Sequence, residues 1–265
     1  MPKLTVSGGE ISCDSDESVL DALLKNGVAV PHSCRKGVCR SCTMRAMKGR
    51  LPAKAQAGLK PTQVHEGYFL ACQCLPDEDL TLADPSGATA FRPATVVLSE
   101  PYSATVQRLI LQPEAPLDYH AGQFVNLRRA DGLIRSYSLA SLPGPVPEIE
   151  LHVKRLQGGA MSGWIADTLH AGDTVGLSEP QGSCFYLPGR AEQNILMIGT
   201  GTGAAPLAAV ARAALRAGHK GDIHLYHGSG TADGLYLHHR LRDLHAAHGN
   251  FHYHPCVSGN AVPLP

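Results

Sequence analysis

Hydrophobic and polar positions alternate over short stretches of residues 1–92, which predicts a small domain with one helix and several short strands. The helix is expected over 18–26, where apolar residues recur on one face. Ser18 and Asp21 have the spacing of a capping box at its start, and Gly27 suits the position after its end. Strands are predicted as a hairpin within 4–11, near 43–47 and near 80–82.

Residues 93–190 differ, because short apolar runs are separated there by turns rich in Pro and Gly. Many short strands at this spacing predict an antiparallel β-barrel. One helix is expected to follow Ser162 and to end near Gly172. The strands are predicted at Ala94–Leu98, Val106–Gln112, Gln123–Leu127, Ser136–Leu139, Ile149–Val153 and Thr174–Leu177.

Strands and helices alternate from residue 191 to residue 265, and this order is typical of a parallel sheet with crossover helices. The predicted elements are strands at Asn194–Ile198, Asp222–Tyr226 and Phe251–Val257, and helices at Pro206–Ala217 and Leu237–His248. We therefore expect a multidomain α+β and α/β chain. An α+β domain would occupy 1–92, a barrel 93–190, and a partial Rossmann-like domain 191–265.

Composition narrows the classes of partner and the compartment. The 23 basic and 23 acidic residues balance, and no basic stripe or polybasic tail indicates binding to nucleic acid or to a membrane. The first residues lack the apolar core of a signal peptide. The eight cysteines are not spread as a disulfide framework, so we expect thiolate metal ligands in a reducing cytoplasm.

Four cysteines have the spacing of a plant-type [2Fe–2S] site. They form a C-x4-C-x2-C stretch and a distant partner 30 positions later: Cys34, Cys39, Cys42 and Cys72. Gly37 gives the tight loop the backbone freedom to turn amides toward sulfur. A zinc site is the alternative, but zinc normally uses two C-x2-C pairs, whereas Cys72-Gln73-Cys74 is C-x-C. The remaining cysteines are expected to be buried small hydrophobes: Cys13, Cys74, Cys184 and Cys256.

Two motifs in the barrel region can hold an anionic dinucleotide. Arg135-Ser136-Tyr137-Ser138 offers a cation for phosphate and an aromatic face for a flavin ring. Gly158-Gly159-Ala160-Met161-Ser162 precedes the predicted helix, whose first amides can bind a pyrophosphate. The alternative for the first motif is an ordinary barrel strand that carries Arg and Tyr.

A glycine loop, Gly199-Thr200-Gly201-Thr202-Gly203, follows a predicted strand and precedes a helix expected to open at Pro206. Such a loop lets the backbone approach phosphates. After the next strand, residues 228–233 contain no Arg or Lys that could hold a 2′-phosphate. This favours NADH over NADPH.

Together these motifs carry a family resemblance. The cysteine region resembles the β-grasp ferredoxin domain of flavoprotein reductases that serve bacterial oxygenases. The R-x-Y-S, G-x-x-S and glycine-loop motifs resemble those of the ferredoxin–NADP reductase superfamily. The resemblance favours Cys72 over Cys74 as the fourth ligand, because relatives have a Leu-x-Cys-Gln context, matched here by Leu70-Ala71-Cys72-Gln73. It implies FAD, because the ferredoxin domain comes first. Arg40 departs from the pattern, since many members have Gly or Ala there.

The resemblance also implies roles for the flavin residues. Arg135 would contact phosphate, Tyr137 would pack on the isoalloxazine ring, and Ser138 would hydrogen-bond to N5. Tyr137 and Ser138 are therefore the candidate catalytic residues. Ser162 would cap the helix that faces the pyrophosphate, with Gly159 and Met161 beside it.

The expected function is that of an oxidoreductase that passes electrons from NADH to FAD, to the cluster and then to a protein acceptor, an oxygenase component. Two alternatives stay open: a non-enzymatic ferredoxin-like carrier with a vestigial NAD lobe, and a deoxysugar-pathway reductase with similar domains. Relatives continue to a Cys-Gly-x-Pro stretch, whereas this sequence stops at Pro265. The NAD lobe is thus expected to be truncated, and reduction by NADH to be slow.

Overall fold

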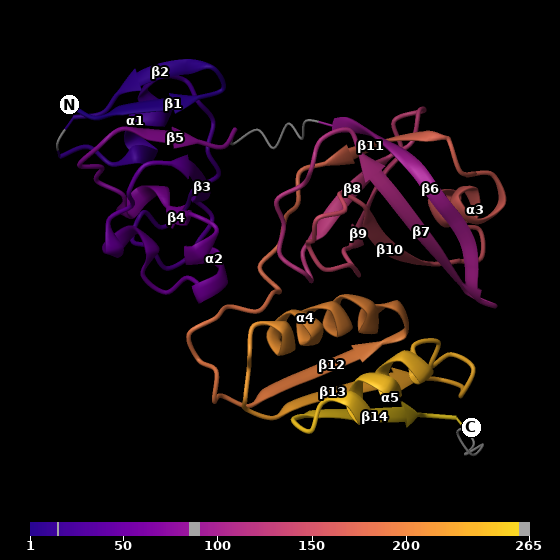
Figure 1. Cartoon of the computed structure of the whole chain (residues 1–265). Helices are drawn as coiled ribbons and strands as arrows, with labels where there is room; N and C mark the ends of the chain where they lie inside the picture. Colours follow the sequence, from indigo (N-terminus) through magenta and orange to yellow (C-terminus); the bar gives the residue numbers. More distant parts are fainter. Residues whose placement is uncertain (15, 85–90, 260–265) are drawn as a thin grey trace. The chain divides into compact units, whose positions relative to one another are not determined.

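A computed structural model describes residues 1–14, 16–84 and 91–259. The chain folds into two compact units, which divide after residue 89. Figure 1 traces the elements of both units along the chain. Among the described residues, no helix combines the length and the apolar character needed to cross a membrane.

The first unit is a mixed sheet on which one helix packs. Its elements are β1 (Lys3–Val6), β2 (Gly9–Ser12), α1 (Val19–Lys25), β3 (Thr43–Lys48), η1 (Ala53–Gln56), α2 (Pro61–His65), β4 (Tyr68–Leu70), η2 (Ala71–Gln73) and β5 (Leu80–Leu82). The strand order is β2-β1-β5-β3-β4. Strand β1 runs parallel to β5, whereas the other pairs are antiparallel. Leu20 and Leu23 of α1 are fully buried with Leu4 and Leu80 of the sheet, as expected for a β-grasp arrangement.

Local signals located α1 correctly. The Ser18 hydroxyl accepts a hydrogen bond from the Asp21 amide at 3.2 Å and donates one to the Asp21 carboxylate at 2.6 Å. Gly27 has φ +77°, the left-handed conformation that favours glycine after a helix. The pattern missed β4 and α2, because three to five residues are too few to establish a period.

The second unit begins with an antiparallel barrel, as predicted. Its elements are β6 (Phe91–Ser103), β7 (Val106–Pro113), β8 (Phe124–Arg128), β9 (Ile134–Ser138), β10 (Ile149–Lys154), α3 (Ala160–Asp167) and β11 (Thr174–Ser178). The order β10-β7-β6-β11-β8-β9 closes on itself, because Leu139 at the end of β9 bridges Leu151 of β10. Leu109, Leu127 and Leu151 are fully buried inside the barrel.

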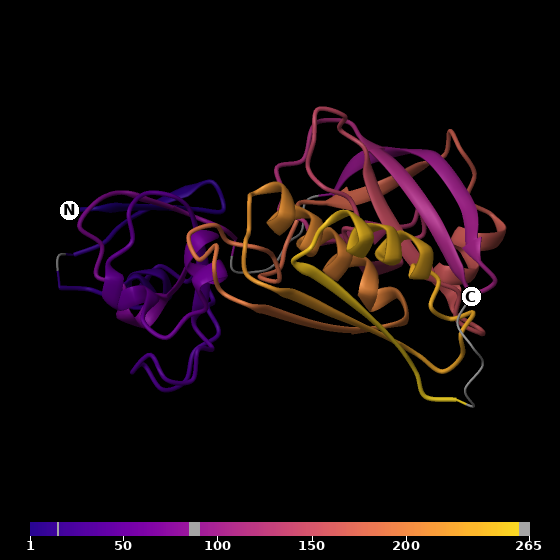
Figure 2. The ribbon, with the colours of Figure 1, turned by 60° about the horizontal axis from the view of Figure 1, so that its bottom comes forward.

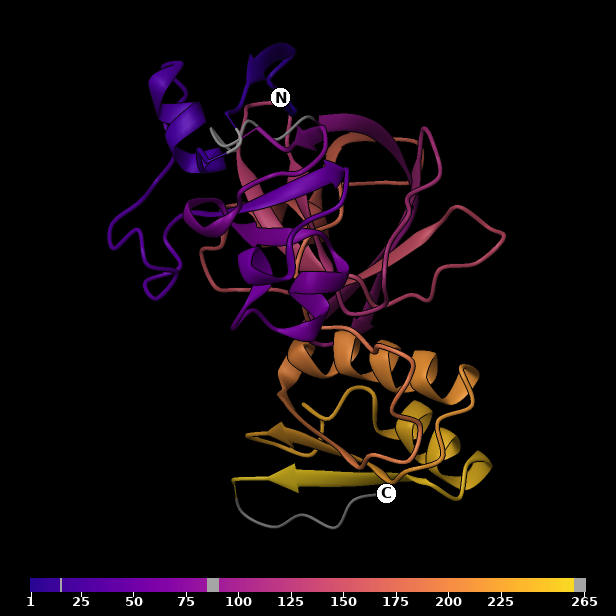
Figure 3. The same ribbon diagram turned by 90° about the vertical axis from the view of Figure 1, so that its left-hand side faces the viewer.

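The same unit contains a three-stranded parallel sheet, also as predicted. Its elements are β12 (Ile195–Thr200), η3 (Gly201–Gly203), α4 (Ala204–Arg216), β13 (Ile223–Ser229), α5 (His238–Ala247) and β14 (Phe251–Val257), in strand order β12-β13-β14. Both helices lie on the same side of the strands (Figure 2), as successive right-handed crossovers require. Figure 3 shows α4 between the strands and the barrel. Met197, Leu225 and Phe251 point toward these helices and are buried.

Several predicted element boundaries were wrong, including the end of α3, which stops at Asp167 rather than near Gly172. Helix α3 begins at Ala160 rather than after Ser162, and α4 begins at Ala204 rather than at Pro206, because Gly159 and Gly203 are the N-cap residues. Strand β6 extends over 13 residues, well beyond the predicted Ala94–Leu98. Two register shifts against β7 interrupt its alternation, and this irregularity hid the full length of the strand.

Candidate functional site

The loop between α1 and β3 turns backbone amides toward sulfur. The Cys34 thiol accepts hydrogen bonds from the amides of Lys36 and Cys39, both at 3.3 Å. The Cys39 thiol accepts one from the Cys34 amide at 3.4 Å and lies 2.8 Å from the Ser41 hydroxyl. The Ser41 hydroxyl and the Cys34 amide lower the pKa of Cys39 to about 6. The loop thus favours a thiolate at Cys39.

The distant cysteine lies beside the third ligand of this loop. The Ala71 amide donates to the Cys42 carbonyl at 3.0 Å, which places Cys72 next to Cys42. The Cys42 thiol is buried, and burial raises its pKa. Gln73 donates to the Arg35 carbonyl at 3.1 Å and approaches the Cys72 sulfur at 3.6 Å. Gln73 therefore holds the Cys72 segment against the loop.

Cys74 has a different environment from Cys72. Cys72 is half-buried, whereas Cys74 is fully buried in the core, and burial raises the pKa of the Cys74 thiol to about 12. The Cys72 segment, by contrast, is hydrogen-bonded to the loop that carries the other three cysteines. Four thiols in two neighbouring pairs, Cys34 with Cys39 and Cys42 with Cys72, fit a [2Fe–2S] cluster.

The structure corrects one prediction about the free cysteines and shows a left-handed backbone conformation at Arg40. Cys13 is buried as expected, but Cys184 and Cys256 are exposed, so the prediction was wrong for that pair. Arg40 has φ +58°. This backbone lies in the left-handed region, which a residue with a side chain adopts only at some cost.

The predicted flavin residues Arg135, Tyr137 and Ser138 all lie on β9. Tyr137 on β9 is half-buried against the barrel core, and burial raises its pKa to about 12. Ser138 follows it and is exposed. The exposed Arg135 guanidinium donates to the carbonyl of its neighbour Ile134 at 2.7 Å. The Arg135 guanidinium can therefore turn toward a phosphate by giving up one exposed hydrogen bond.

The first turn of α3 differs from the prediction for Ser162. Ser162 does not cap the helix: it is the third helical residue, and Gly159 is the N-cap. The buried Ser162 hydroxyl accepts from the Leu156 amide at 3.1 Å and donates to the Gly159 carbonyl at 3.4 Å. It therefore shapes the turn, while the side chain of Met161 packs in the barrel core.

Sequence reasoning missed an arginine that joins the turn between β8 and β9 to α3. Arg129, just after β8, donates to the Ala160 carbonyl at 3.1 Å, lies over the Trp164 ring at 5.8 Å, and pairs with Asp131 at 2.5 Å. No motif signalled this residue, because its partner is 31 positions away in the sequence.

The glycine loop between β12 and α4 is tightly built. A Cβ at Gly199 would lie 2.9 Å from Leu207 Cδ1 and 3.0 Å from the Gly203 carbonyl oxygen. Gly201 has φ +52°. No side chain caps α4 at Gly203, and the Ala204 amide donates to the carbonyls of Gly201 and Thr202.

The structure brings the flavin motif and the glycine loop to one cavity of about 370 Å³. The barrel contributes Ser136, Tyr137, Ser138, His152, Lys154 and Leu156, and the parallel-sheet part contributes Thr202, Gly203, Ala205 and Pro206. Gly159 lines a different cavity, of about 660 Å³, with Gly158 and Ala160. Arg135 and Gly199 through Gly201 are not among the residues that line the first cavity.

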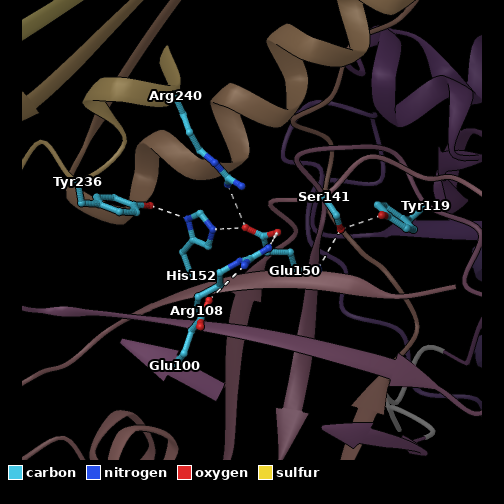
Figure 4. Close-up of polar contacts among 8 residues, drawn as sticks. All are labelled: Glu100, Arg108, Tyr119, Ser141, Glu150, His152, Tyr236 and Arg240. Atoms are coloured by element: carbon cyan, nitrogen blue, oxygen red, sulfur yellow. Dashed lines mark hydrogen bonds and ion pairs between the residues drawn. The ribbon is translucent and has the colours of Figure 1, made fainter. Parts of the chain in front are cut away.

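His152, which sequence reasoning also missed, connects the two parts beside this cavity (Figure 4). Its Nδ1 lies 2.8 Å from the Tyr236 hydroxyl, and its Nε2 lies 2.7 Å from Glu150. Burial alone would raise the pKa of Glu150, but hydrogen bonds from His152 and Arg108 hold that pKa at about 2. Arg240 of α5 approaches the same carboxylate at 3.5 Å. The sequence of β10 shows polar residues at alternate positions. It does not show that one of them, His152, contacts Tyr236 in the parallel-sheet part of the unit.

Three sequence families match the chain in succession. They are the 2Fe-2S iron-sulfur cluster binding domain over residues 4–77, the oxidoreductase FAD-binding domain over 94–186, and the oxidoreductase NAD-binding domain over 197–262. The matches agree with the cofactor set that the motifs predicted: a [2Fe–2S] cluster, FAD and NAD.

Known proteins resemble almost the whole chain. The reductase subunit of an aromatic O-demethylase from Amycolatopsis sp. (strain ATCC 39116 / 75iv2) is 33% identical over 98% of this chain and 81% of its own length. A ferredoxin–NAD(P)(+) reductase component of naphthalene 1,2-dioxygenase/salicylate 5-hydroxylase systems from Ralstonia sp. is 30% identical over 96% of this chain and 79% of its own. The crystal structure of an Amycolatopsis cytochrome P450 reductase superposes with a TM-score of 0.62 at 32% identity, covering 99% of this chain and 83% of that one.

These matches confirm the resemblance and the multidomain fold that the sequence indicated. Because the family profiles and the relatives agree in domain content and order, the chain belongs to the family of ferredoxin–NAD(P) reductase components, NAD(P)H-dependent flavoprotein oxidoreductases with a [2Fe–2S] domain, an FAD-binding domain and an NAD-binding domain.

Proposed function

We propose that this chain is the reductase component of an oxygenase system, which moves electrons from NADH through FAD and the cluster to an oxygenase component. The observation that carries the proposal is the cavity that Tyr137 and Ser138 share with Thr202 and Gly203. Electron transfer from a nicotinamide to a flavin requires both rings in one pocket, and the two motifs meet there. The relatives named as reductase components of oxygenases support the choice of acceptor.

On the flavin side, we assign the roles to residues that border this cavity or lie near it. Tyr137 offers a ring face for stacking, and the Ser138 hydroxyl offers a hydrogen bond at the reacting edge. Arg135 supplies the cation for the phosphates, and the Met161 amide, in the first turn of α3, supplies a donor. The amide of the N-cap residue Gly159 donates to the Leu156 carbonyl at 3.0 Å, so Gly159 contributes close backbone approach instead. FAD, when bound, accepts two electrons at once and releases them singly.

On the nicotinamide side, we assign the pyrophosphate to the backbone of the loop from Gly199 to Gly203. This loop also contains Thr200, Gly201 and Thr202. Residues 228–233 provide no cation for a 2′-phosphate, which supports NADH. We assign the nicotinamide to the side of the cavity formed by Thr202 and Gly203.

In the first unit, we assign the cluster to Cys34, Cys39, Cys42 and Cys72. We further propose that the three functional domains divide near residues 92 and 190, and that the protein works in the cytoplasm, where thiolates stay reduced. No side-chain acid, base or nucleophile is required by this chemistry, so the residues bind, orient and insulate.

A reduction experiment tests the proposal. Protein replete in FAD and cluster is mixed anaerobically with NADH, and flavin and cluster absorbance are followed, with oxygenase or a one-electron protein acceptor added afterwards. The proposal expects bleaching of both centres and NADH oxidation that depends on the acceptor. Reduction of the cluster by dithionite but not by NADH would instead indicate an electron carrier. Electron transfer to a deoxysugar dehydrase, together with no transfer to any oxygenase tested, would indicate the sugar-pathway alternative.

A further inference from the structure

The face of the parallel sheet opposite α4 and α5 holds a group of potential metal ligands. Alternate residues of β12 on this face, Leu196 and Ile198, are 66% and 71% exposed. On the neighbouring strands the same face carries His224 and His252, which are directly paired in the parallel register of β13 and β14. Asp222 immediately precedes β13. The NADH and flavin residues lie elsewhere, so this group is not part of the site described above.

The distances within this group are short. One potential ligand atom from each of Asp222, His224 and His252 lies within 4.8 Å of the other two. His252 Nε2 is 3.0 Å from the Asp222 carboxylate. The rings of His224 and His252 stack with centroids 4.7 Å apart. Their closeness follows from strand pairing rather than from the rotamer of one exposed side chain.

A fourth residue holds one of the rings. His254 Nε2 lies 3.0 Å from His224 Nδ1, and its ring stacks on Tyr226 at 4.3 Å. An outer partner that fixes the ring and its tautomer is the usual companion of a histidine ligand. The arrangement therefore has two histidines and a carboxylate at the centre and one ordered neighbour.

Two imidazoles with one carboxylate form a donor set for borderline divalent metals. In a tetrahedral site with metal–nitrogen bonds of about 2.0–2.1 Å, ligand atoms are separated by about 3.4 Å. The potential ligand atoms lie within 4.8 Å of one another, so small side-chain movements would bring them to that separation. An ion held there would link β13 to β14.

We propose that Asp222, His224 and His252 bind a divalent transition-metal ion of the zinc class, with His254 orienting His224. The site joins two adjacent strands on the outer face of the sheet. It is a binding site separate from the electron path, and the proposal stands whether or not the chain acts as an oxygenase reductase.

Calorimetric titration with Zn²⁺ tests the proposal on the oxidised protein with FAD and cluster bound. One saturable site is expected. His224→Ala with His252→Ala should weaken binding at least tenfold, since even the loss of an outer partner costs about tenfold to a hundredfold. The matched control is His239→Ala with His248→Ala, which removes two exposed histidines of the same lobe and should leave the affinity unchanged.

A spectroscopic probe identifies the ligands. The oxidised cluster and oxidised FAD are diamagnetic, so half an equivalent of Cu²⁺ should give an EPR signal that comes from the added ion alone. Nitrogen hyperfine structure is expected in the parent and control proteins and should be lost in the double histidine variant. Asp222→Asn keeps the side-chain shape and should also weaken Zn²⁺ binding. It therefore tests the proposal even if the double histidine variant does not fold.

Other results would overturn the proposal. These are the absence of a saturable Zn²⁺ site in the parent protein, equal affinities in the double variant and the control, or loss of binding in Cys256→Ser alone. The last result would show that the exposed thiol of β14, rather than the histidine pair, holds the ion.

Discussion

At the scale of single residues, the environment of each side chain decides whether its chemistry is usable. Cys72 and Cys74 are two positions apart, yet one is half-buried beside Cys42 and the other is sealed in the core. Arg129 and Arg135 likewise differ. Arg129 is held by Asp131 and by the Ala160 carbonyl, whereas the exposed Arg135 donates to the carbonyl of its neighbour Ile134.

Cys72→Ser should abolish the visible spectrum of the cluster, because the fourth thiolate is lost. Cys74→Ser should keep the spectrum but destabilise the unit by about 1–3 kcal/mol, the cost of burying a hydroxyl without a partner. Iron and sulfide analysis together with thermal unfolding separates the two effects. The opposite result, with the cluster kept in Cys72→Ser and lost in Cys74→Ser, would refute the ligand assignment.

Arg135→Ala should weaken FAD binding about tenfold to a hundredfold, because a charge-assisted contact contributes about 1.5–3 kcal/mol. Fluorescence of FAD released on dilution measures the change. Arg216→Ala, at the exposed last turn of α4, is the control and should retain FAD. Equal retention in both variants would mean that another group holds the phosphates.

At the scale of elements, turns and strand registers place the ligand-binding backbone. The β12–α4 turn brings the Gly199 Cα so close to Gly203 that a side chain does not fit without movement. On β13, alternation directs His227 into the core, where it is fully buried. Its ring is near Tyr253, with Nδ1 3.5 Å from the hydroxyl.

Gly199→Ala should raise the KM for NADH with little loss of FAD, since the added methyl pushes the start of α4 away from its position. Small misplacements near a reacting pair can cost up to about a hundredfold in rate. Gly230→Ala is the matched control, because a Cβ there meets nothing within 4 Å. Steady-state kinetics on both variants checks the expectation. An unchanged KM in Gly199→Ala would argue against the loop as the dinucleotide site.

His227 should make the second unit sensitive to mild acid. Burial lowers the pKa of His227 from 6.5 to about 4, so the unfolded chain takes up a proton before the folded one does. The stability contributed by the neutral ring is complete above pH 6.5 and is lost as the pH falls from 6.5 toward 4. His227→Phe should flatten this slope, by on the order of 2 kcal/mol across the window.

Thermal unfolding between pH 7 and pH 4.5, followed by the fluorescence of Trp164, measures the slope, because this is the one tryptophan of the chain and lies in α3. His239→Phe changes an exposed histidine of the same lobe and should leave the slope as it is. A parent protein with no loss of stability in this interval would contradict the prediction.

At the scale of the whole molecule, the barrel and the parallel sheet act as one unit because polar groups join them. His152 of β10 and Tyr236 before α5 are 84 positions apart and hydrogen-bonded at 2.8 Å. Arg108, Glu150 and Arg240 extend the network (Figure 4). The cavity between the flavin motif and the glycine loop depends on this contact, since His152 lines it.

Tyr236→Phe should lower the free energy of unfolding of the second unit by about 1 kcal/mol, with a further penalty if the buried His152 nitrogen is left without a partner. It should also slow flavin reduction by NADH, because the cavity loses a fixed wall. Tyr226→Phe, on the open sheet face, is the control for both measurements. Denaturant unfolding and rapid mixing would contradict the prediction if the two variants behaved alike.

Short-range patterns determined much of this protein. Each of these patterns spans only a short stretch of sequence, over which local sterics and hydrogen bonds act. They are the C-x4-C-x2-C spacing, the capping box at Ser18, the glycine loop and the alternation of strands and helices. The fold class, the order of the domains and the cofactor set could therefore be predicted. Element starts such as Ala160 and Ala204 could not, because a helix end depends on which neighbouring amides find partners.

Tertiary structure alone decided which distant groups meet. It placed Cys72 beside Cys42, set Tyr137 across a cavity from Gly203, joined His152 to Tyr236, and paired His224 with His252 across two strands. The sequence contains each of these residues, but not their separation in space. That separation follows from sheet register and from the packing of one lobe on another, which are set by the whole hydrophobic core rather than by any single motif.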